Sequence, residues 1–176
     1  GRQAEFREGV ARGIAAAKAL GVGRLNCLVG LTPPGLPAAK VREMVGENIH
    51  YAADKLGAEG IRLMVEPVNH LDMPGFALNT CGQVLELIEA IGHPNAFLQF
   101  DVYHACREGE DPFAILANHL ERIGHIQIAD CPGRHQPGTG TTDFKRLFAA
   151  IDRSGYQGFV SLEYIPAPDT AASLAW

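Results

Sequence analysis

The chain has 176 residues, of which 47% are hydrophobic and 20% are charged, and its formal net charge is −5 with the histidines neutral. This acidic balance argues against a nucleic-acid partner, which normally shows a basic patch, and no run of about 18 apolar residues is present that could span a membrane. The length suits one domain with a sizeable core. The four cysteines form no CxxC pair and are interpreted as reduced thiols of a cytoplasmic protein.

The first part of the chain predicts a helix, a strand and a second helix. Residues 4–20 carry apolar residues at helical spacing and end at Gly21, a natural C-cap. The short apolar run "RLNCLVG" around Cys27 is a strand candidate. Pro37 suits the first turn of the next helix, which should stop at Gly57.

The middle of the chain continues the alternation. "IRLMVEP" reads as a strand, and Thr80 and Gln83 have the spacing of a capping box that begins a helix. After the strand candidate "NAFLQFD", Asp111 and Pro112 suit the N-cap and first residue of another helix. "IGHIQIAD" predicts the next strand.

The last part predicts a helix that starts after Thr142 or Asp143, the strand "GFVSLEY", and the first turn of a helix in "DTAASLAW". The five strand candidates therefore centre near residues 27, 64, 99, 127 and 161, with a helix in each gap. Such βα repetition requires a parallel sheet. The mostly apolar strands fit burial on both faces.

Two α/β architectures fit this pattern, an open doubly wound sheet and a (β/α)₈ TIM barrel, which normally needs about 250 residues and eight strands. Only five strands are visible, and the chain starts in a helix and ends as one begins. We therefore expect residues 1–176 to be a single partial TIM-barrel domain, the C-terminal five βα units with the first three missing. Its outer strands would leave open edges that invite pairing or aggregation.

Four successive strand candidates end in a side chain that could bind a metal. These side chains are Glu66, Asp101, either Gln127 or Asp130, and Glu163. The carboxyl ends of parallel strands meet at one rim, so the four would face a common centre. Oxygen ligands favour a hard divalent cation, and we expect Mg²⁺ or Mn²⁺.

The two glutamates suggest acid–base chemistry beside this metal. One carboxylate can remove a proton from a substrate carbon while the metal stabilises an enediolate, and the other can return a proton to the neighbouring carbon. Such a pair is suited to aldose–ketose isomerisation or to epimerisation beside a carbonyl. Glu66 and Glu163 are the candidate catalytic residues.

Three further residues are candidates for substrate binding. His104 lies three residues after Asp101 and could hydrogen-bond a substrate hydroxyl. The Gly- and Pro-rich loop over residues 130–140 carries Arg134 and His135. Arg134 could hold a carboxylate or phosphate group.

With these residues assembled, the chain resembles the hydroxypyruvate isomerase family of the xylose isomerase-like barrels. The likeness covers most of residues 5–166 and is carried by the stretches "RLNCLVG", "YAADKLGAEGIRLMVEPVN", "MPGFALNT", "LIEAIGHPNAFLQFDVYH", "ERIGHIQIADCPGRHQPGTG" and "GYQGFVSLEYIP". The resemblance implies a (β/α)₈ barrel that interconverts hydroxypyruvate and tartronate semialdehyde, or a close 2-oxo acid analogue.

The resemblance also implies roles for individual residues. It places the metal on Glu66, Asp101, Gln127 and Glu163, and so favours Gln127 over Asp130. It makes Glu66 and Glu163 the catalytic pair, and His104 and Arg134 substrate contacts. The chain departs from the family at Thr141, where an acid is usual, and at Ile165, where a lysine is common.

Several alternatives stay open at this point. The nearest are a 2-oxo-tetronate isomerase and a ketose 3-epimerase. A nuclease would need more strand-end histidines and a basic groove, and an inactive remnant would act as an interaction module. The expected partner is a small 2-oxo acid or sugar rather than nucleic acid or membrane, with a homo-oligomer as an open alternative.

Overall fold

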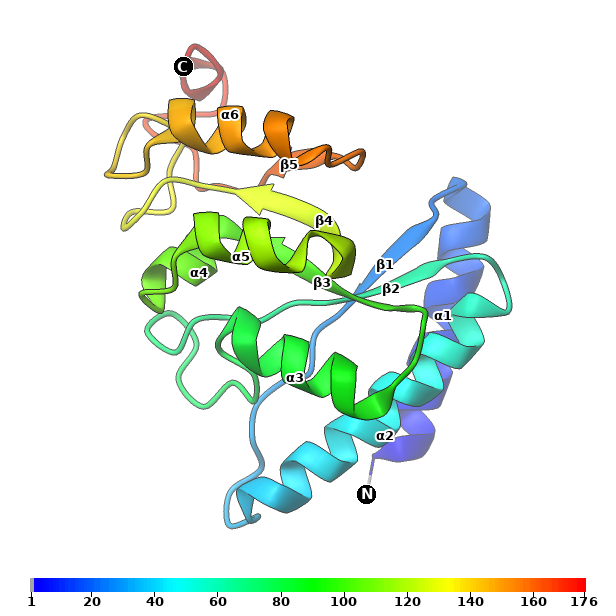
Figure 1. Ribbon diagram of the computed structural model, residues 1–176. Coiled ribbons are helices and arrows are strands. Elements are labelled where there is room, and N and C mark those ends of the chain that lie inside the picture. The colour runs from blue at the N-terminus through cyan, green and yellow to red at the C-terminus, as the bar shows by residue number, and fades with distance from the viewer. Residues whose placement is uncertain (1) are drawn as a thin grey trace.

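The computed structural model describes residues 2–176 and shows five parallel strands, each hydrogen-bonded to the strand that follows it in the chain (Figure 1). The strands are β1 (Arg24–Cys27), β2 (Arg62–Val65), β3 (Ala96–Asp101), β4 (Ile123–Ile128) and β5 (Val160–Leu162). Consecutive order with parallel pairing is the arrangement of neighbouring βα units in a barrel wall. The curled five-stranded sheet confirms the expected part of a TIM barrel.

Helices precede β1 and fill the gaps between successive strands. They are α1 (Gln3–Leu20), α2 (Ala38–Gly57), α3 (Cys81–Ile91), α4 (Val102–Arg107), α5 (Pro112–His119) and α6 (Phe144–Ser154), with 3₁₀ turns η1 (Leu120–Arg122) and η2 (Ala172–Leu174). Within residues 2–176, no helix combines the length and the apolar character needed to cross a bilayer.

The helix ends follow the local chemistry predicted from the sequence. α1 ends at Gly21, whose left-handed backbone (φ 66°) suits glycine. Thr80 caps α3 in a reciprocal capping box with Gln83, since each side chain bonds the other residue's backbone N–H. At α6 the structure selects Asp143 as the N-cap, because its carboxylate accepts the N–H of Arg146 at 2.9 Å.

Two local expectations differ from the structure. Pro37 is the N-cap of α2 rather than its first helical residue. The C-terminal segment forms the short turn η2 instead of beginning an α-helix. The short helix α4 was not predicted, because six residues are too few to show a helical repeat.

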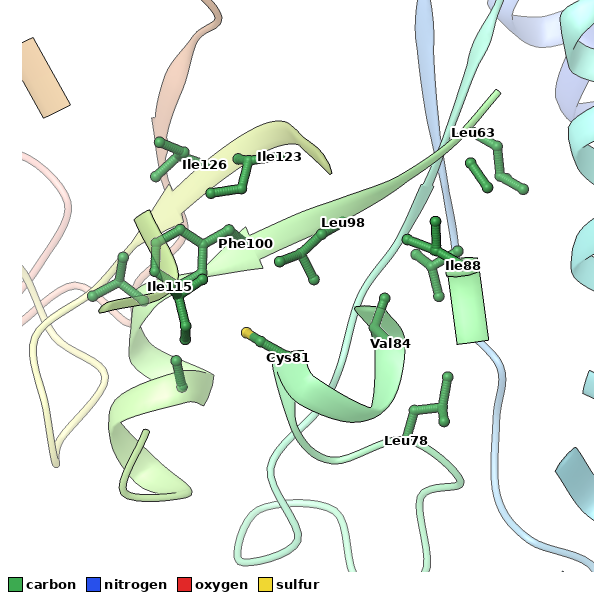
Figure 2. Close-up of a cluster of buried hydrophobic side chains, with 14 of the residues drawn as sticks. Leu63, Leu78, Cys81, Val84, Ile88, Leu98, Phe100, Ile115, Ile123 and Ile126 are labelled. Atoms are coloured by element: carbon green, nitrogen blue, oxygen red, sulfur yellow. The ribbon is translucent and has the colours of Figure 1, made fainter. Parts of the chain in front are cut away.

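The hydrophobic core lies between the sheet and its helices (Figure 2). Alternate strand residues point into it, among them Leu63, Val65, Leu98, Phe100, Ile126 and Ile128. Successive strand side chains face opposite sides of a sheet. The same alternation therefore turns Gln99, Asp101 and Gln127 to the inner face, where Asp101 and Gln127 are paired in register.

Candidate metal and substrate site

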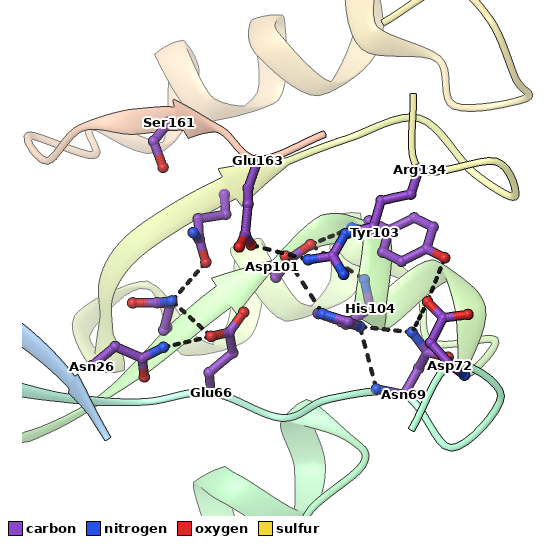
Figure 3. Close-up of polar contacts among 12 residues, drawn as sticks. Asn26, Glu66, Asn69, Asp72, Asp101, Tyr103, His104, Arg134, Ser161 and Glu163 are labelled. Atoms are coloured by element: carbon purple, nitrogen blue, oxygen red, sulfur yellow. Dashed lines mark hydrogen bonds and ion pairs between the residues drawn. The ribbon is translucent and has the colours of Figure 1, made fainter. Parts of the chain in front are cut away.

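The four predicted metal ligands lie at the carboxyl ends of adjacent strands. Glu66 follows β2, Asp101 ends β3, Gln127 is the penultimate residue of β4, and Glu163 follows β5. Figure 3 shows the side chains of Glu66, Asp101 and Glu163 pointing toward the same space from three strands. The rim location expected for a barrel site is therefore present.

Glu66, Asp101 and His104 form a compact buried cluster. Each offers a potential ligand atom, and these atoms all lie within 4.8 Å of one another. All three side chains are buried. Buried acids at this spacing repel each other unless a proton or a cation lies between them.

One oxygen of Asp101 is well bonded and the other has no partner. Oδ1 accepts the backbone N–H groups of Tyr103 at 2.8 Å and of His104 at 3.3 Å, and thereby caps α4. Oδ2 is buried without a hydrogen bond. Burial, with the negative charge of Glu66 next, raises the pKa of Asp101 to about 7. An orphaned carboxylate oxygen of this kind fits a site for a divalent cation.

Glu66 is held on one oxygen and open on the other. Its Oε2 accepts Nδ2 of Asn26 at 2.5 Å and Nε2 of Gln99 at 2.9 Å. Burial raises the pKa of Glu66 to about 7, while the bond from Asn26 opposes this shift and the charge of Glu163 adds to it. A carboxyl with a pKa near neutrality can exchange protons at physiological pH.

Gln99 connects Glu66 to Gln127. Its Nε2 also donates to Oε1 of Gln127 at 2.6 Å. Because an ionised Glu66 can only accept, it fixes which end of the Gln99 amide faces it, and Gln99 in turn fixes the amide of Gln127. The structure therefore joins Gln127 to the cluster through one intermediate side chain.

Glu163 is the least buried of the predicted ligands. Its side chain is half exposed, and its Oε2 accepts Nη2 of Arg134 at 3.1 Å. The guanidinium of Arg134 also lies 5.2 Å from the ring centroid of Tyr103. Arg134 has a left-handed backbone (φ 56°), which is unusual for a residue with a side chain and is common where a loop serves a site.

The loop that carries Arg134 is fastened by Asp130, the residue left as an alternative ligand. Its carboxylate accepts four backbone N–H groups, from Cys131, Gly138, Gly140 and Thr142, at 2.7–3.1 Å. Both oxygens are therefore engaged in the loop. At Gly140 a Cβ would collide with this carboxylate and with the carbonyl of Cys131, so the turn needs glycine.

His104 and His135 have different surroundings. His104 is buried on α4 and contacts Asn69, and burial, followed by the charge of Arg134, lowers its pKa to about 4. His135 instead places Nδ1 2.7 Å from the carbonyl oxygen of Ile165, tying its loop to the segment after β5. The structure does not bring His135 into the acidic cluster.

Sequence reasoning missed three residues that support the site: Asn26, Asn69 and Gln99. Asn26 and Gln99 are polar residues inside otherwise apolar strands, and Gln99 lies two residues before Asp101 on the same face. That spacing was an available signal. Asn69 lies on a loop, and no local pattern points to its partner 35 residues away.

Comparisons with known proteins agree on the family. A family model described as xylose isomerase-like TIM barrel matches residues 1–176. Over 176 residues the chain is 44% identical to hydroxypyruvate isomerase of Escherichia coli (strain K12), covering all of this chain and 68% of that protein. It is 37% identical over 177 residues to 2-oxo-tetronate isomerase of Cupriavidus necator, with the same coverage. A crystal structure titled AP endonuclease, family 2 from Brucella melitensis matches with a TM-score of 0.95 and 36% identity, covering all of this chain and 68% of that one.

The chain therefore belongs to the xylose isomerase-like TIM barrel family. The resemblance to hydroxypyruvate isomerases is confirmed, and the two curated relatives above are both isomerases. The chain is accordingly an enzyme of the isomerase class, and it spans 68% of the length of each of these three proteins.

Proposed function

We propose that the chain is a divalent-metal-dependent isomerase that interconverts hydroxypyruvate and tartronate semialdehyde, with residues 1–176 acting as one catalytic part-barrel domain. The observation that carries the proposal is the unpartnered Oδ2 of Asp101, buried beside the open side of Glu66. A structural acid would have its oxygens satisfied by N–H donors, as Asp130 does.

Glu66, Asp101, Gln127 and Glu163 would hold the cation. An all-oxygen set suits Mg²⁺ or Mn²⁺ better than a soft metal. When bound, the cation would stabilise negative charge that develops on the substrate oxygens during proton transfer.

Glu66 and Glu163 would carry the proton transfer. In the forward direction one carboxylate takes a proton from the hydroxyl-bearing carbon, leaving an enediolate. The other carboxylate delivers a proton to the former carbonyl carbon, and exchange of the O–H protons completes the isomerisation.

The substrate carboxylate would be held by Arg134, whose side chain already pairs with an acid at the rim. His104 would donate a hydrogen bond to a substrate oxygen from the buried side of the site. His135 is retained as a prediction for the outer end of the substrate, because its loop is the one that carries Arg134.

The second candidate substrate is 2-oxo-tetronate, favoured by the 37% identity to an isomerase of that name. The exposed Ile165 stands close to the loop of Arg134, since its N–H donates to the carbonyl oxygen of Arg134 at 2.6 Å. We place hydroxypyruvate first because the identity to a hydroxypyruvate isomerase is higher, at 44%.

The test is solvent deuterium incorporation into each substrate, with Mn²⁺ or Mg²⁺ added. Wild type should exchange the substrate proton and isomerise hydroxypyruvate, and Glu66→Gln and Glu163→Gln should each fail to isomerise it and should lose exchange at the carbon that the replaced carboxylate serves. Glu59→Gln is the matched control, because Glu59 pairs with Lys18 away from the site. Isomerisation at the wild-type rate in either site variant would refute the acid–base pair. Absence of any metal-dependent shift in melting of the wild type would favour an inactive interaction module.

A further inference from the structure

We propose that Asn69 is a positioning residue that sets the tautomer of His104, so that His104 presents an Nε2–H donor to the site and is not a metal ligand. The tautomer follows from the contacts alone, and its consequence for catalysis rests on the proposed function. Asn69 lies on the loop between β2 and α3 and is fully buried.

The orientation of the Asn69 amide is settled by its neighbour Asp72. The backbone N–H of Asp72 donates to Oδ1 of Asn69 at 2.9 Å. The other end of the amide is therefore Nδ2, which donates to Oδ2 of Asp72 at 3.0 Å. Asp72 in turn accepts the hydroxyl of Tyr103 at 2.5 Å, which docks this loop onto α4.

Nδ1 of His104 faces two donors and no acceptor from this loop. Nδ2 of Asn69 lies at 2.7 Å and the backbone nitrogen of Asn69 at 3.3 Å (Figure 3). A nitrogen that accepts hydrogen bonds carries no proton, so the imidazole is neutral and its single proton is on Nε2.

Nε2 points toward the acidic cluster, 3.9 Å from Oδ2 of Asp101. A histidine that ligates a metal through one nitrogen normally donates a hydrogen bond from the other to a carboxylate or carbonyl. His104 shows the reverse arrangement, because Asn69 offers only hydrogen-bond donors to Nδ1, the ring nitrogen that faces away from the acidic cluster. In the cluster of Glu66, Asp101 and His104, the two acids therefore offer oxygen ligands and His104 offers a hydrogen-bond donor.

This assignment has two chemical consequences. The ligand set contains only oxygen atoms, which favours hard cations. The Nε2–H group lies beside the place where substrate oxygen charge develops, where a fixed donor stabilises it without needing to reorient.

The test is a long-range ¹H–¹⁵N correlation spectrum of the metal-free protein labelled with ¹⁵N-histidine, with His104 assigned by its loss in His104→Gln. Wild type should show protonated Nε2 and bare Nδ1 at neutral pH. Addition of Mg²⁺ and then of Zn²⁺ should leave the Nε2–H signal of His104 in place. A wild-type signal with the proton on Nδ1, or loss of Nε2–H on metal binding, would overturn the proposal whatever the variants do.

The variants test whether Asn69 sets the tautomer of His104. Asn69→Asp replaces Nδ2 with an acceptor and should move the proton to Nδ1, while Asn69→Leu should give averaged shifts because only the backbone donor remains. Asn79→Leu is the matched control, because Nδ2 of Asn79 donates a hydrogen bond to the carbonyl oxygen of Val68 in the same loop and does not contact His104. Wild-type shifts in a folded Asn69→Asp would overturn the role of Asn69.

Activity is read separately. If the proposed function holds, Asn69→Asp should lose about tenfold or more in kcat with a smaller change in Mn²⁺ affinity, as expected for an outer residue that orients a reacting group. If the wild type shows the predicted tautomer of His104 but no isomerase activity, the proposed function is refuted and the tautomer assignment stands.

Discussion

Replacing Asp101 with asparagine should make the metal-free protein more stable above neutral pH, although Asp101 is a proposed metal ligand. The carboxylate is 1% exposed, and its pKa is raised to about 7 chiefly by burial and then by the charge of Glu66. Asparagine keeps one oxygen that can accept the N–H groups of Tyr103 and His104, so the cap of α4 survives.

The magnitude follows from the pKa shift. The pKa rises from an ordinary value of 3.8 to about 7 on folding, and each unit corresponds to about 1.4 kcal/mol, so keeping Asp101 ionised costs about 4 kcal/mol. Because its pKa is raised, the folded state binds more protons than the unfolded state, and stability falls as pH rises from about 4 to about 7. The new amide N–H group lacks a partner at a cost of about 2 kcal/mol. The variant should therefore gain about 2 kcal/mol at about pH 8 and lose about 2 kcal/mol at about pH 4.

The assay is urea unfolding in a chelating buffer at both pH values, followed by titration with Mn²⁺. Metal should raise the midpoint of the wild type and not that of Asp101→Asn. Asp111→Asn is the matched control, since exposed Asp111 caps α5 through the N–H of Phe113 at 2.9 Å and should be nearly neutral. A variant that is less stable than wild type at high pH, yet still gains stability from Mn²⁺, would refute the reasoning.

Three further substitutions test the surroundings of the site. Gln99→Met removes the amide between Glu66 and Gln127 and should weaken Mn²⁺ binding about tenfold in calorimetry; unchanged affinity would mean that Gln99 does not orient these ligands. Asp130→Asn deprives part of the loop of its acceptor and should cost about 3 kcal/mol and expose residues 131–142 to proteolysis; a protected loop would contradict this. Thr80→Ala removes the capping box of α3 and should cost about 1 kcal/mol in urea unfolding without changing metal affinity.

Much of the fold could be predicted because its signals are local. The N-caps at Thr80 and Asp111 and the C-cap at Gly21 depend on backbone groups within a few residues, so the sequence displays both partners. The strand ends at Glu66 and Asp101 were equally visible, since each acid follows an apolar run. The helix α4 was missed because one and a half turns show no periodicity.

The order of amino acids was enough to predict the alternation of helices and strands and, through the resemblance, the family. Three features became visible only in the folded chain: the unpartnered oxygen of Asp101, the link that Gln99 makes between Glu66 and Gln127, and the contact of Asn69 with Nδ1 of His104. Most of these contacts join residues that are far apart in the chain. Hydrogen bonds that span 28 to 40 residues leave no periodic trace in the sequence, and they exist only once the parallel strands bring their ends to one rim.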